Sequence, residues 1–448
     1  MALLGAVGAV AVAMAAGSAG AKAKPTGGLA SRGSITLNVW SADIQDPGPK
    51  PVIETLTKQF EKKYPNVKVK LTFKDFTSYM KVIQLTMNSS NAPDVAEGNQ
   101  GYATDALLVK AKTIVPLDTY AKKYGWNAWY SAGTAQQFRW TPDGKTFGKG
   151  NLWGVGQFGQ STGIFYNKAK LKKLGFSGPL PTTFAGFDKL LGTLRAKLGK
   201  SEPVINLGNK DGYEAVHAWG MIQGAFVTGK SVRDWIFHVP GSTFDNPGNV
   251  KSLDVLARWA KAGYFGGDYN SIGENDASVA FAKGKGVFYL GGNWQAQVIK
   301  DGLGDDAGFI NGPPGSSGKD VAIGSTSLPW HISSKSKNKD VAAAYIDFIV
   351  RATKNGAAKL MYSQNQIPAI SGAPKAVGDP YLTAVAGGWQ KLVKQDGLTL
   401  FPDWTSDTML TTLGGEFQKL MAGRTTSADV AKAVQADWAK FDKQVSKK

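Results

Sequence analysis

The chain contains no cysteine and only three histidines, His217, His238 and His331. Without cysteine it has no disulfide, no thiolate metal ligand and no cysteine nucleophile. The three histidines are far apart in the sequence, so their spacing does not indicate a zinc site. These absences exclude several classes of enzyme and metalloprotein. They are compatible with an exported protein that does not rely on disulfides.

Acidic residues are also scarce: there are 34 of them against 52 Lys and Arg, and the net charge is +18. The basic residues are spread along the whole chain, with small clusters only at 168–173 and 335–339. A nucleic-acid-binding protein favours a concentrated basic stripe with aromatic residues between the charges. We therefore predict that the lysines form a solvated surface and that nucleic acid is not a partner.

Long apolar runs are missing as well. The run Ala2–Ala16 is too short to span a membrane comfortably and resembles the apolar part of a secretory signal. We predict that residues 1–33 form a leader and a flexible tether. In bacterial lipoproteins a lipid-carrying cysteine follows such a run, and here Ser18 stands in its place. The expected location is extracellular and associated with the cell envelope. The protein would be secreted with ordinary cleavage of the leader near Ala19–Ala23, or it would be held by a lipid anchor if Ser18 replaces a cysteine.

With 448 residues and 42% hydrophobic residues, the chain has material for two ordinary globular domains. Period-two patterns predict strands over 35–40, 67–73 and 94–96, and amphipathic patterns predict helices over 52–64 and 79–88. Strands that alternate with helices indicate an α/β protein with a parallel, doubly wound sheet. The C-terminal part predicts further helices over 341–353, 356–365, 408–422 and 427–445.

The segment Phe281–Gln295 indicates a wall of a ligand cleft. It predicts a buried strand over 287–290, ended by Gly291 and Gly292 and followed by Asn293-Trp294-Gln295. In open α/β sheets, ligands bind beyond the carboxyl ends of the strands. We interpret the glycine pair as letting the backbone pass close beneath a ligand while the indole forms a stacking floor. The alternative is a strand followed by a helix, with Trp294 in the core.

Several short motifs occur in one characteristic order. They are ITLNVW (35–40), FEKKYPNVKVKL (60–71), NAPDV (91–95), VPLD (115–118), LWGV (152–155) with GIFYNK (163–168), the segment 281–294, and ISSKSKNK (332–339). Together they resemble the extracellular solute-binding proteins of ABC sugar importers, the large maltose-binding-like class. The similarity covers nearly all of residues 34–448. One departure is Phe184–Phe187, where the usual Trp and acidic residues are replaced.

The resemblance implies a two-lobed, type II periplasmic-binding-protein-like α/β fold with the ligand cleft between the lobes and closure by a hinge. It assigns residues 34–150 mostly to the first lobe and 151–289 mostly to the second. Residues 290–448 are then expected to return to the first lobe, with the C-terminal helices crossing the hinge. It also implies the subunits of an ABC permease as partners, a monomer, and no cofactor.

A sugar-binding cleft needs flat aromatic faces and side chains that hydrogen-bond hydroxyl groups. Loops at the expected strand ends and crossovers contain both aromatic and hydrogen-bonding side chains. Among the hydrogen-bonding side chains of these loops, amides outnumber carboxylates. The predicted ligand-binding residues are Trp40, Asp43, Gln45, Asn99, Gln100, Gln157, Gln160, Asn293, Trp294, Trp330, Asp403 and Trp404. Next to Trp330, His331 has no serine elbow or matching acid, so we expect a packed or solvent-facing histidine.

The sequence thus predicts a non-enzymatic protein that captures a sugar or oligosaccharide and delivers it to an ABC permease. Two alternatives remain open at this point. A secreted glycoside-active enzyme would share such a cleft but needs an acid and a base or nucleophile facing one bond. A binding protein for a polyamine or a peptide would keep the fold and change the ligand, and a polyamine would want more carboxylates in the cleft.

Overall fold

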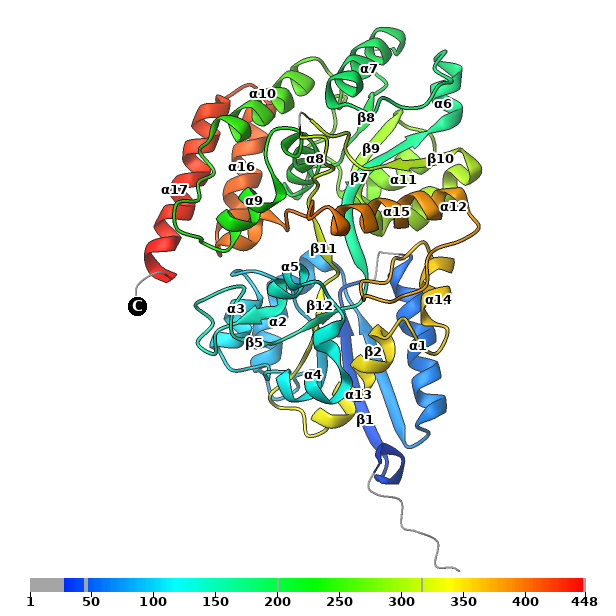
Figure 1. Ribbon diagram of the computed structural model, residues 1–448, viewed down its shortest axis with the longest axis vertical. Coiled ribbons are helices and arrows are strands. Elements are labelled where there is room, and N and C mark those ends of the chain that lie inside the picture. Colours follow the sequence, from blue (N-terminus) through cyan, green and yellow to red (C-terminus); the bar gives the residue numbers. More distant parts are fainter. Residues whose placement is uncertain (1–27, 44–46, 200, 316, 446–448) are drawn as a thin grey trace, which may run out of the picture.

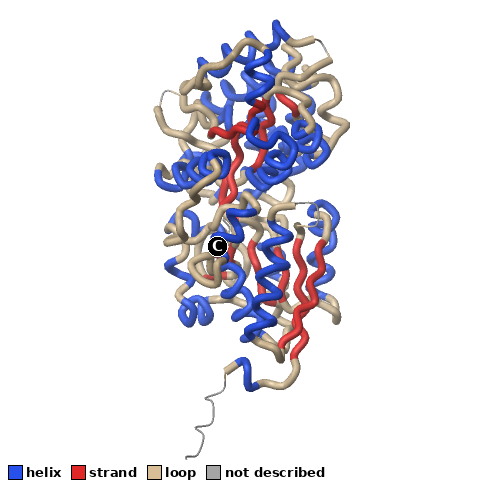
Figure 2. The backbone as a smooth tube through the Cα atoms, turned by 90° about the vertical axis from the view of Figure 1, so that its right-hand side faces the viewer, coloured by secondary structure: helices blue, strands red, loops and turns tan. Residues whose placement is uncertain are grey.

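The computed structural model describes residues 28–43, 47–199, 201–315 and 317–445. Most of the predicted leader, Ser18 and the predicted site residue Gln45 lie outside these residues. The described chain forms two α/β lobes that are stacked along the long axis of the molecule (Figure 1). Each lobe has its own central sheet of mixed strand directions with helices packed around it (Figure 2). The predicted two-lobed α/β fold is confirmed. None of the described helices is long and apolar enough to cross a membrane.

The first lobe is built on a sheet with the strand order β2-β1-β3-β12-β6. The parallel pair of β1 (Ile35–Ser41) and β2 (Val67–Phe73) explains the period-two pattern, since Leu37 and Val39 of β1 are fully buried. The other elements of this lobe are α1 (Pro49–Lys63), α2 (Phe76–Asn88), β3 (Val95–Glu97), α3 (Asp105–Lys110), α4 (Asp118–Tyr124), η2 (Trp126–Ala128), α5 (Ala132–Ala135), η3 (Gln136–Phe138), β4 (Arg139–Trp140), β5 (Asn151–Leu152), β6 (Val155–Gly156), β12 (Pro329–Ile332), α13 (Lys339–Val350) and α14 (Ala357–Ser363), preceded by η1 (Leu29–Ser31).

The second lobe has a sheet with the order β10-β7-β9-β8, and β11 pairs with the start of β7. Its elements are β7 (Gly159–Asn167), α6 (Lys168–Lys173), α7 (Phe184–Lys197), β8 (Ile205–Asn206), α8 (Glu214–Gln223), α9 (Gly229–Ile236), α10 (Pro247–Lys261), α11 (Glu274–Ala282), β9 (Phe288–Gly292), η4 (Asn293–Gln295), α12 (Ala296–Leu303), η5 (Gly304–Asp306), β10 (Ala307–Ile310), β11 (Gly324–Thr326), α15 (Pro380–Lys394), η6 (Pro402–Thr405), α16 (Met409–Met421) and α17 (Ser427–Val445).

The last third of the chain is shared between the lobes. After β12, helix α13 packs against α1 of the first lobe, as the predicted return to that lobe would require. From α15 onward the contacts are with the second lobe: α15 lies against β10 and β7, α16 lies against α8 and α10, and α17 lies against α10 and α16. Trp438 of α17 donates its indole N–H to the carbonyl of Trp235 at 2.8 Å. The chain therefore crosses back to the second lobe, and the second lobe contains its C-terminal helices.

The glycine pair near Trp294 forms the last two residues of the strand, whereas we predicted that the strand stops before it. Gly291 and Gly292 belong to β9 and pair with Gly163 and Thr162 of β7. Gly292 has an ordinary extended backbone, but a Cβ added there would lie 2.0–2.1 Å from three ring carbons of Trp294. Glycine is needed at this position because the indole of Trp294 folds back over it. The space above the strand is filled by that ring and not by a ligand.

Helix α15 was not predicted from the sequence, although it carries a strong start signal. Pro380 is its first residue, and the Asp379 carboxylate accepts hydrogen bonds from the backbone N–H groups of Tyr381 and Leu382. A capping aspartate before a proline is typical of a helix N-terminus. The helix packs on the second-lobe sheet through side chains such as Val385 and Trp389.

Candidate functional site

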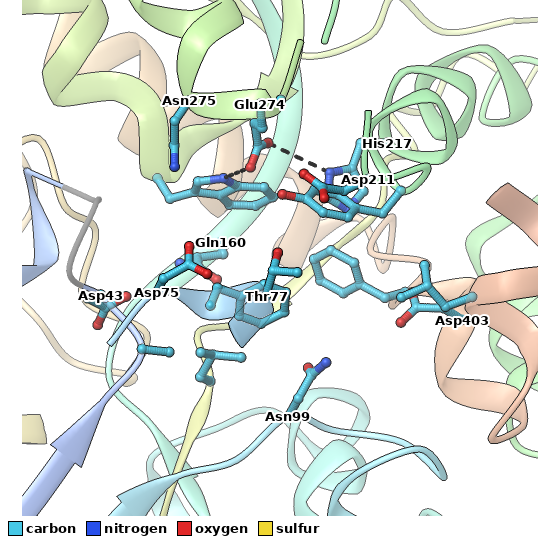
Figure 3. Close-up of a pocket in the computed structure, with 18 of the residues that line it drawn as sticks. Asp43, Asp75, Thr77, Asn99, Gln160, Asp211, His217, Glu274, Asn275 and Asp403 are labelled. Carbon is cyan, nitrogen blue, oxygen red and sulfur yellow. Dashed lines mark hydrogen bonds and ion pairs between the residues drawn. The ribbon is translucent and has the colours of Figure 1, made fainter. Parts of the chain in front are cut away.

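A cavity of about 440 Å³ lies between the two lobes. Both lobes and the segments that connect them contribute to its walls (Figure 3). The lining residues are Ala42, Asp43, Asp75, Phe76, Thr77, Asn99, Gln100, Gln160, Lys210, Asp211, Tyr213, His217, Gly273, Glu274, Asn275, Asp276, Trp294, Thr326, Leu328, Phe401, Asp403, Trp404 and Leu410. The volume and the mixture of aromatic and polar groups are those of a small-molecule site.

These residues meet because strands and helix starts of both lobes end at the cavity. In the first lobe, Asp43 follows β1, Asn99 and Gln100 follow β3, and the N-terminus of α2 begins at Asp75. In the second lobe, Trp294 follows β9, and the starts of α8 and α11 supply neighbouring side chains. A cleft beyond the carboxyl ends of strands is the expected ligand position in open α/β folds.

The indole of Trp294 is held in one orientation. Its N–H donates to Oε2 of Glu274 at 3.1 Å, and the ring is 9% exposed. The His217 imidazole meets it edge-on with 5.5 Å between ring centroids, and Phe401 lies 6.5 Å away on the same side. In Figure 3, dashed lines from Glu274 mark its hydrogen bond with the indole and its ion pair with His217. An aromatic face fixed in this way is preorganised for stacking, because its rotamer is settled before a ligand arrives.

The segment η6 closes one end of the cavity and ties the lobes together. The Trp404 carbonyl accepts a hydrogen bond from the backbone N–H of Tyr102 at 3.1 Å. Gly101 has a φ of +91°, and a Cβ there would lie 2.5 Å from Cα of Trp404. Only glycine combines this left-handed conformation with so close an approach. The loop after β3 therefore lies directly against η6.

Burial changes the acid–base behaviour of two lining carboxyls. Removal from water raises the pKa of Asp43 to about 6. A hydrogen bond from the Ser41 hydroxyl favours the charged form and partly opposes this shift. Removal from water also raises the pKa of Asp403 to about 6, and the nearby His217 partly opposes this shift. Both groups are therefore mostly ionised at neutral pH and titrate just below it.

Seven of the predicted residues line the cavity: Asp43, Asn99, Gln100, Gln160, Trp294, Asp403 and Trp404. Gln100 is only 2% exposed, and its side-chain amide donates to Gln137 and to the carbonyl of Ser327. Asn99 and Gln160 are half-buried. The cavity places these residues together, and their role in ligand binding stays a prediction.

Four predicted residues lie outside the lining. Gln157 and Trp330 are fully buried; the Gln157 amide donates to the carbonyl of Ile349 and accepts from the Trp330 indole. Asn293 accepts from the Ser161 N–H and donates to the Gly159 carbonyl, so it joins β7 to the end of β9. The ring of Trp40 is half-buried against Tyr79 and is covered by the ammonium group of Lys74 at 4.3 Å. In each case the polar or aromatic group is used within the protein.

Sequence analysis missed the lining residues at the starts of α8 and α11. Tyr213 and His217 come from α8 and the residue before it, and Glu274 opens α11. A signal was present, because Gly273 followed by Glu-Asn-Asp is a typical helix start with acidic residues in the first turn. The loop before α8 follows β8, which has only two residues, and it was therefore not recognised as a strand end.

Amides outnumber carboxylates among the predicted loop residues that line the cavity, but not in the lining as a whole. Six lining residues carry carboxylates, namely Asp43, Asp75, Asp211, Glu274, Asp276 and Asp403, and four carry amides, namely Asn99, Gln100, Gln160 and Asn275. Within the part of the chain that the structure describes, no group of three or more His, Cys, Asp or Glu residues is arranged to hold a metal ion. His331 is packed in the core, where it contacts Asp105 and the Trp153 carbonyl.

The chain belongs to the bacterial extracellular solute-binding protein family, whose model matches residues 42–355. The resemblance noted in the sequence is thereby confirmed. Among curated proteins it is similar to the multiple sugar-binding protein of Streptococcus mutans serotype c, with 27% identity over 207 residues. That match covers 43% of this chain and 45% of the relative, so the chain spans less than half the length of the curated relative it matches.

Solved structures show the same fold over almost the whole chain. A chitin oligosaccharide binding protein superposes with a TM-score of 0.76 at 19% identity, covering 92% of this chain and 99% of its own. The GacH receptor of Streptomyces glaucescens GLA.O, solved without ligand and with acarbose, gives 0.72 at 19% identity, covering 92% and 99%. Identities this low establish the common fold, and the ligand of this chain has to be argued from its own residues.

Proposed function

We propose that the protein captures a sugar or oligosaccharide outside the membrane and delivers it unchanged to an ABC permease. The observation that carries this proposal is the cavity between the lobes, which combines fixed aromatic rings with hydrogen-bonding side chains from both lobes. The family membership and the sugar-binding relatives support it. The protein would act as a monomer in the extracellular or cell-envelope space.

The chemistry of the walls suits a sugar in two ways. The flat ring of Trp294 offers a face for the C–H side of a pyranose. The side chains of Asn99 and Gln160 each carry a donor and an acceptor, which matches the hydroxyl group. Because these groups come from different lobes and from the connecting strand β7, a ligand that contacts all of them favours the closed arrangement of the lobes.

The direct test is a panel of mono-, di- and trisaccharides, with the melting temperature of the protein as the first measurement. A ligand at about 100 times its Kd stabilises a protein that binds only in the folded state by about 2.7 kcal/mol. Any sugar that raises the melting temperature is then titrated by calorimetry. A panel without a shift would contradict sugar capture and favour a peptide or another solute.

Trp294→Ala tests whether the cavity is the binding site. Aromatic truncation at a stacking position costs about 1–3 kcal/mol of affinity, by analogy with stacked bases. Trp438→Ala is the matched control, because Trp438 is 8% exposed against 9% for Trp294 and lies in α17 outside the lining. We expect Trp294→Ala to lose affinity and Trp438→Ala to lose stability with affinity kept. Full affinity in Trp294→Ala would refute the site.

A glycoside-active enzyme is the second candidate, favoured by the six lining carboxylates. Hydrolysis needs one carboxyl group as acid and a second as base or nucleophile on the two sides of one glycosidic bond. The experiment is to incubate the protein with each oligosaccharide that it binds and to measure reducing ends over time. Their release would replace the transport proposal with an enzymatic one.

A further inference from the structure

The charge of the cavity is opposite to that of the protein. The chain carries a net charge of +18, yet the lining contains six carboxylates and a single lysine, Lys210. Figure 3 shows these acids on several sides of the cavity, with Asp43 and Asp75 on one side, Asp403 on the opposite side, and Asp211 and Glu274 along the second-lobe wall. A cleft lined by charges of one sign between low-dielectric walls concentrates their field on the space inside.

The protein does not neutralise these charges itself. Outside the cavity, acids such as Asp188 and Asp347 pair with arginines. Among the described residues, none of the six lining carboxylates forms an ion pair with a lysine or an arginine; Nδ1 of the His217 imidazole lies 3.9 Å from Oε1 of Glu274. Glu274 accepts only the neutral indole N–H of Trp294, and Asp211 and Asp276 are exposed at the cavity. Neighbouring like charges disfavour one another, so a positive group from a ligand would be stabilised among them.

Two further groups on the second-lobe wall bear on the ligand. Burial, and then the charges of Glu274, Glu214 and Asp211, raise the pKa of the Tyr213 hydroxyl far above its ordinary value. The second group is His217, which is 7% exposed, lines the cavity and has no hydrogen-bond partner at Nδ1 in the described structure. A buried imidazole nitrogen without a partner is costly unless a ligand supplies one.

We propose that the ligand is a saccharide with a free, positively charged amino group. The amine would lie against the carboxylates of the second-lobe wall, where Asp211, Glu274 and the neighbouring Asp276 accept its hydrogens. Charge-assisted hydrogen bonds of this kind are about twice as strong as neutral ones. The inference rests on the proposed function, since it narrows the class of sugar that the cleft takes.

The aromatic and amide groups select an amino sugar over a linear polyamine. A polyamine has neither a ring face for Trp294 and Phe401 nor hydroxyl groups for Asn99 and Gln160. An N-acetylated sugar has the ring and the hydroxyl groups but no charge. A polyamine can pair with the carboxylates but not with the aromatic and amide groups, and an N-acetylated sugar does the reverse. Only the free amino sugar can contact both kinds of group.

The test compares glucosamine, galactosamine and the β-1,4-linked di- and trimers of glucosamine with their N-acetylated counterparts by calorimetry at neutral pH and low salt. We expect the best free amine to bind about tenfold or more tightly than its acetylated counterpart, as charged hydrogen bonds imply. The preference should shrink in ~0.5 M salt, where charges are strongly screened.

The matched variants are Asp211→Asn and Asp254→Asn. Both remove one negative charge from the second lobe, but Asp211 lines the cavity and Asp254 is an exposed residue of α10 outside it. Asp211→Asn should weaken the amino sugar about tenfold and leave neutral sugars unaffected, while Asp254→Asn changes neither. Thermal unfolding of both variants checks that the fold is kept.

The outcomes separate this inference from the proposed function. Equal or tighter binding of the acetylated sugars overturns the amino-sugar inference and keeps sugar capture. Binding of spermidine as tight as that of the amino sugars also overturns it, in favour of a polyamine-binding protein. If neither these amino sugars nor any neutral sugar binds, both proposals fail.

Discussion

Replacing Gly292 with alanine tests whether the indole of Trp294 forms part of the ligand surface. The backbone of Gly292 has φ −83° and ψ 152°, a conformation that alanine adopts freely. The added Cβ, however, would lie 2.0–2.1 Å from three ring carbons of Trp294. Because non-bonded carbons rest about 3.5–4.0 Å apart, the overlap is about 1.5 Å, and the ring has to move.

The direction of that movement follows from the surroundings of the ring. The indole is anchored to Glu274 on one edge and meets His217 on another, and its remaining free side is the cavity that it lines. In Gly292→Ala the ring is pushed into the ligand space and the bond to Glu274 lengthens. We expect affinity to fall by about 1–3 kcal/mol, or roughly 5- to 150-fold. Overpacking should also cost about 1–3 kcal/mol of stability.

The assay is calorimetric titration with the ligand found in the sugar panel, combined with thermal unfolding of the free protein. Gly387→Ala is the control, because a Cβ at this position in α15 meets no atom within 4 Å. It should leave affinity unchanged and raise stability by up to ~1 kcal/mol through helix propensity. A folded Gly292→Ala protein with the affinity of the wild type would refute the reasoning.

Three further changes test other parts of the description. Burial favours the protonated form of Asp403, so the ionised carboxylate destabilises the folded protein. This destabilisation is absent below the ordinary pKa of 3.8 and complete above a pH of about 6. Asp403→Asn should therefore raise the unfolding free energy by roughly 1–3 kcal/mol at pH 7 and by little at pH ~4, measured in urea; an equal gain at both pH values would contradict the shift. Asp105→Ala removes the buried partner of His331, and a loss of about 3–5 kcal/mol in stability with unchanged ligand affinity is expected. Gln157→Leu leaves the Ile349 carbonyl unpaired and should cost about 1–3 kcal/mol of stability, again without loss of affinity; lower affinity would return Gln157 to the binding site.

Local pattern was enough to locate many of the elements. The strand predicted over 67–73 has the same bounds as β2, and the helix predicted over 427–445 has those of α17. In α17 the apolar residues form one buried face, and in β2 the lysines between the apolar residues are exposed, so the period of the pattern is visible in the sequence. The lobes and the cleft followed from the order of motifs and not from any single segment. The prediction that residues 290–448 return to the first lobe depends on which lobe each helix packs on. An amphipathic pattern shows that a helix has a buried face, but not which lobe covers that face.

The candidate site was harder to predict because the fate of a polar side chain depends on distant segments. Gln157 and Gln160 are three residues apart on the same crossover, yet one is sealed in the core by Trp330 and the other reaches the cavity. Likewise, a glycine pair in the sequence indicates the end of a strand, but glycine is needed at Gly292 because the indole of Trp294, two residues later, lies against its backbone. Sequence proximity gave the correct neighbourhood, and tertiary packing decided which atoms face the ligand.

The path of the C-terminal helices has a consequence for how the protein is made. Helix α17 buries Val430, Val434 and Trp438 against parts of the second lobe whose own segments lie about 200 residues earlier, and the bond from Trp438 to Trp235 spans 203 positions. The sheet of the first lobe can form once β12 has been synthesised, but one side of the second-lobe core stays uncovered until α17 has been synthesised. Contacts of such long range slow folding. The core of the second lobe is therefore completed by contacts between segments that lie far apart in the sequence.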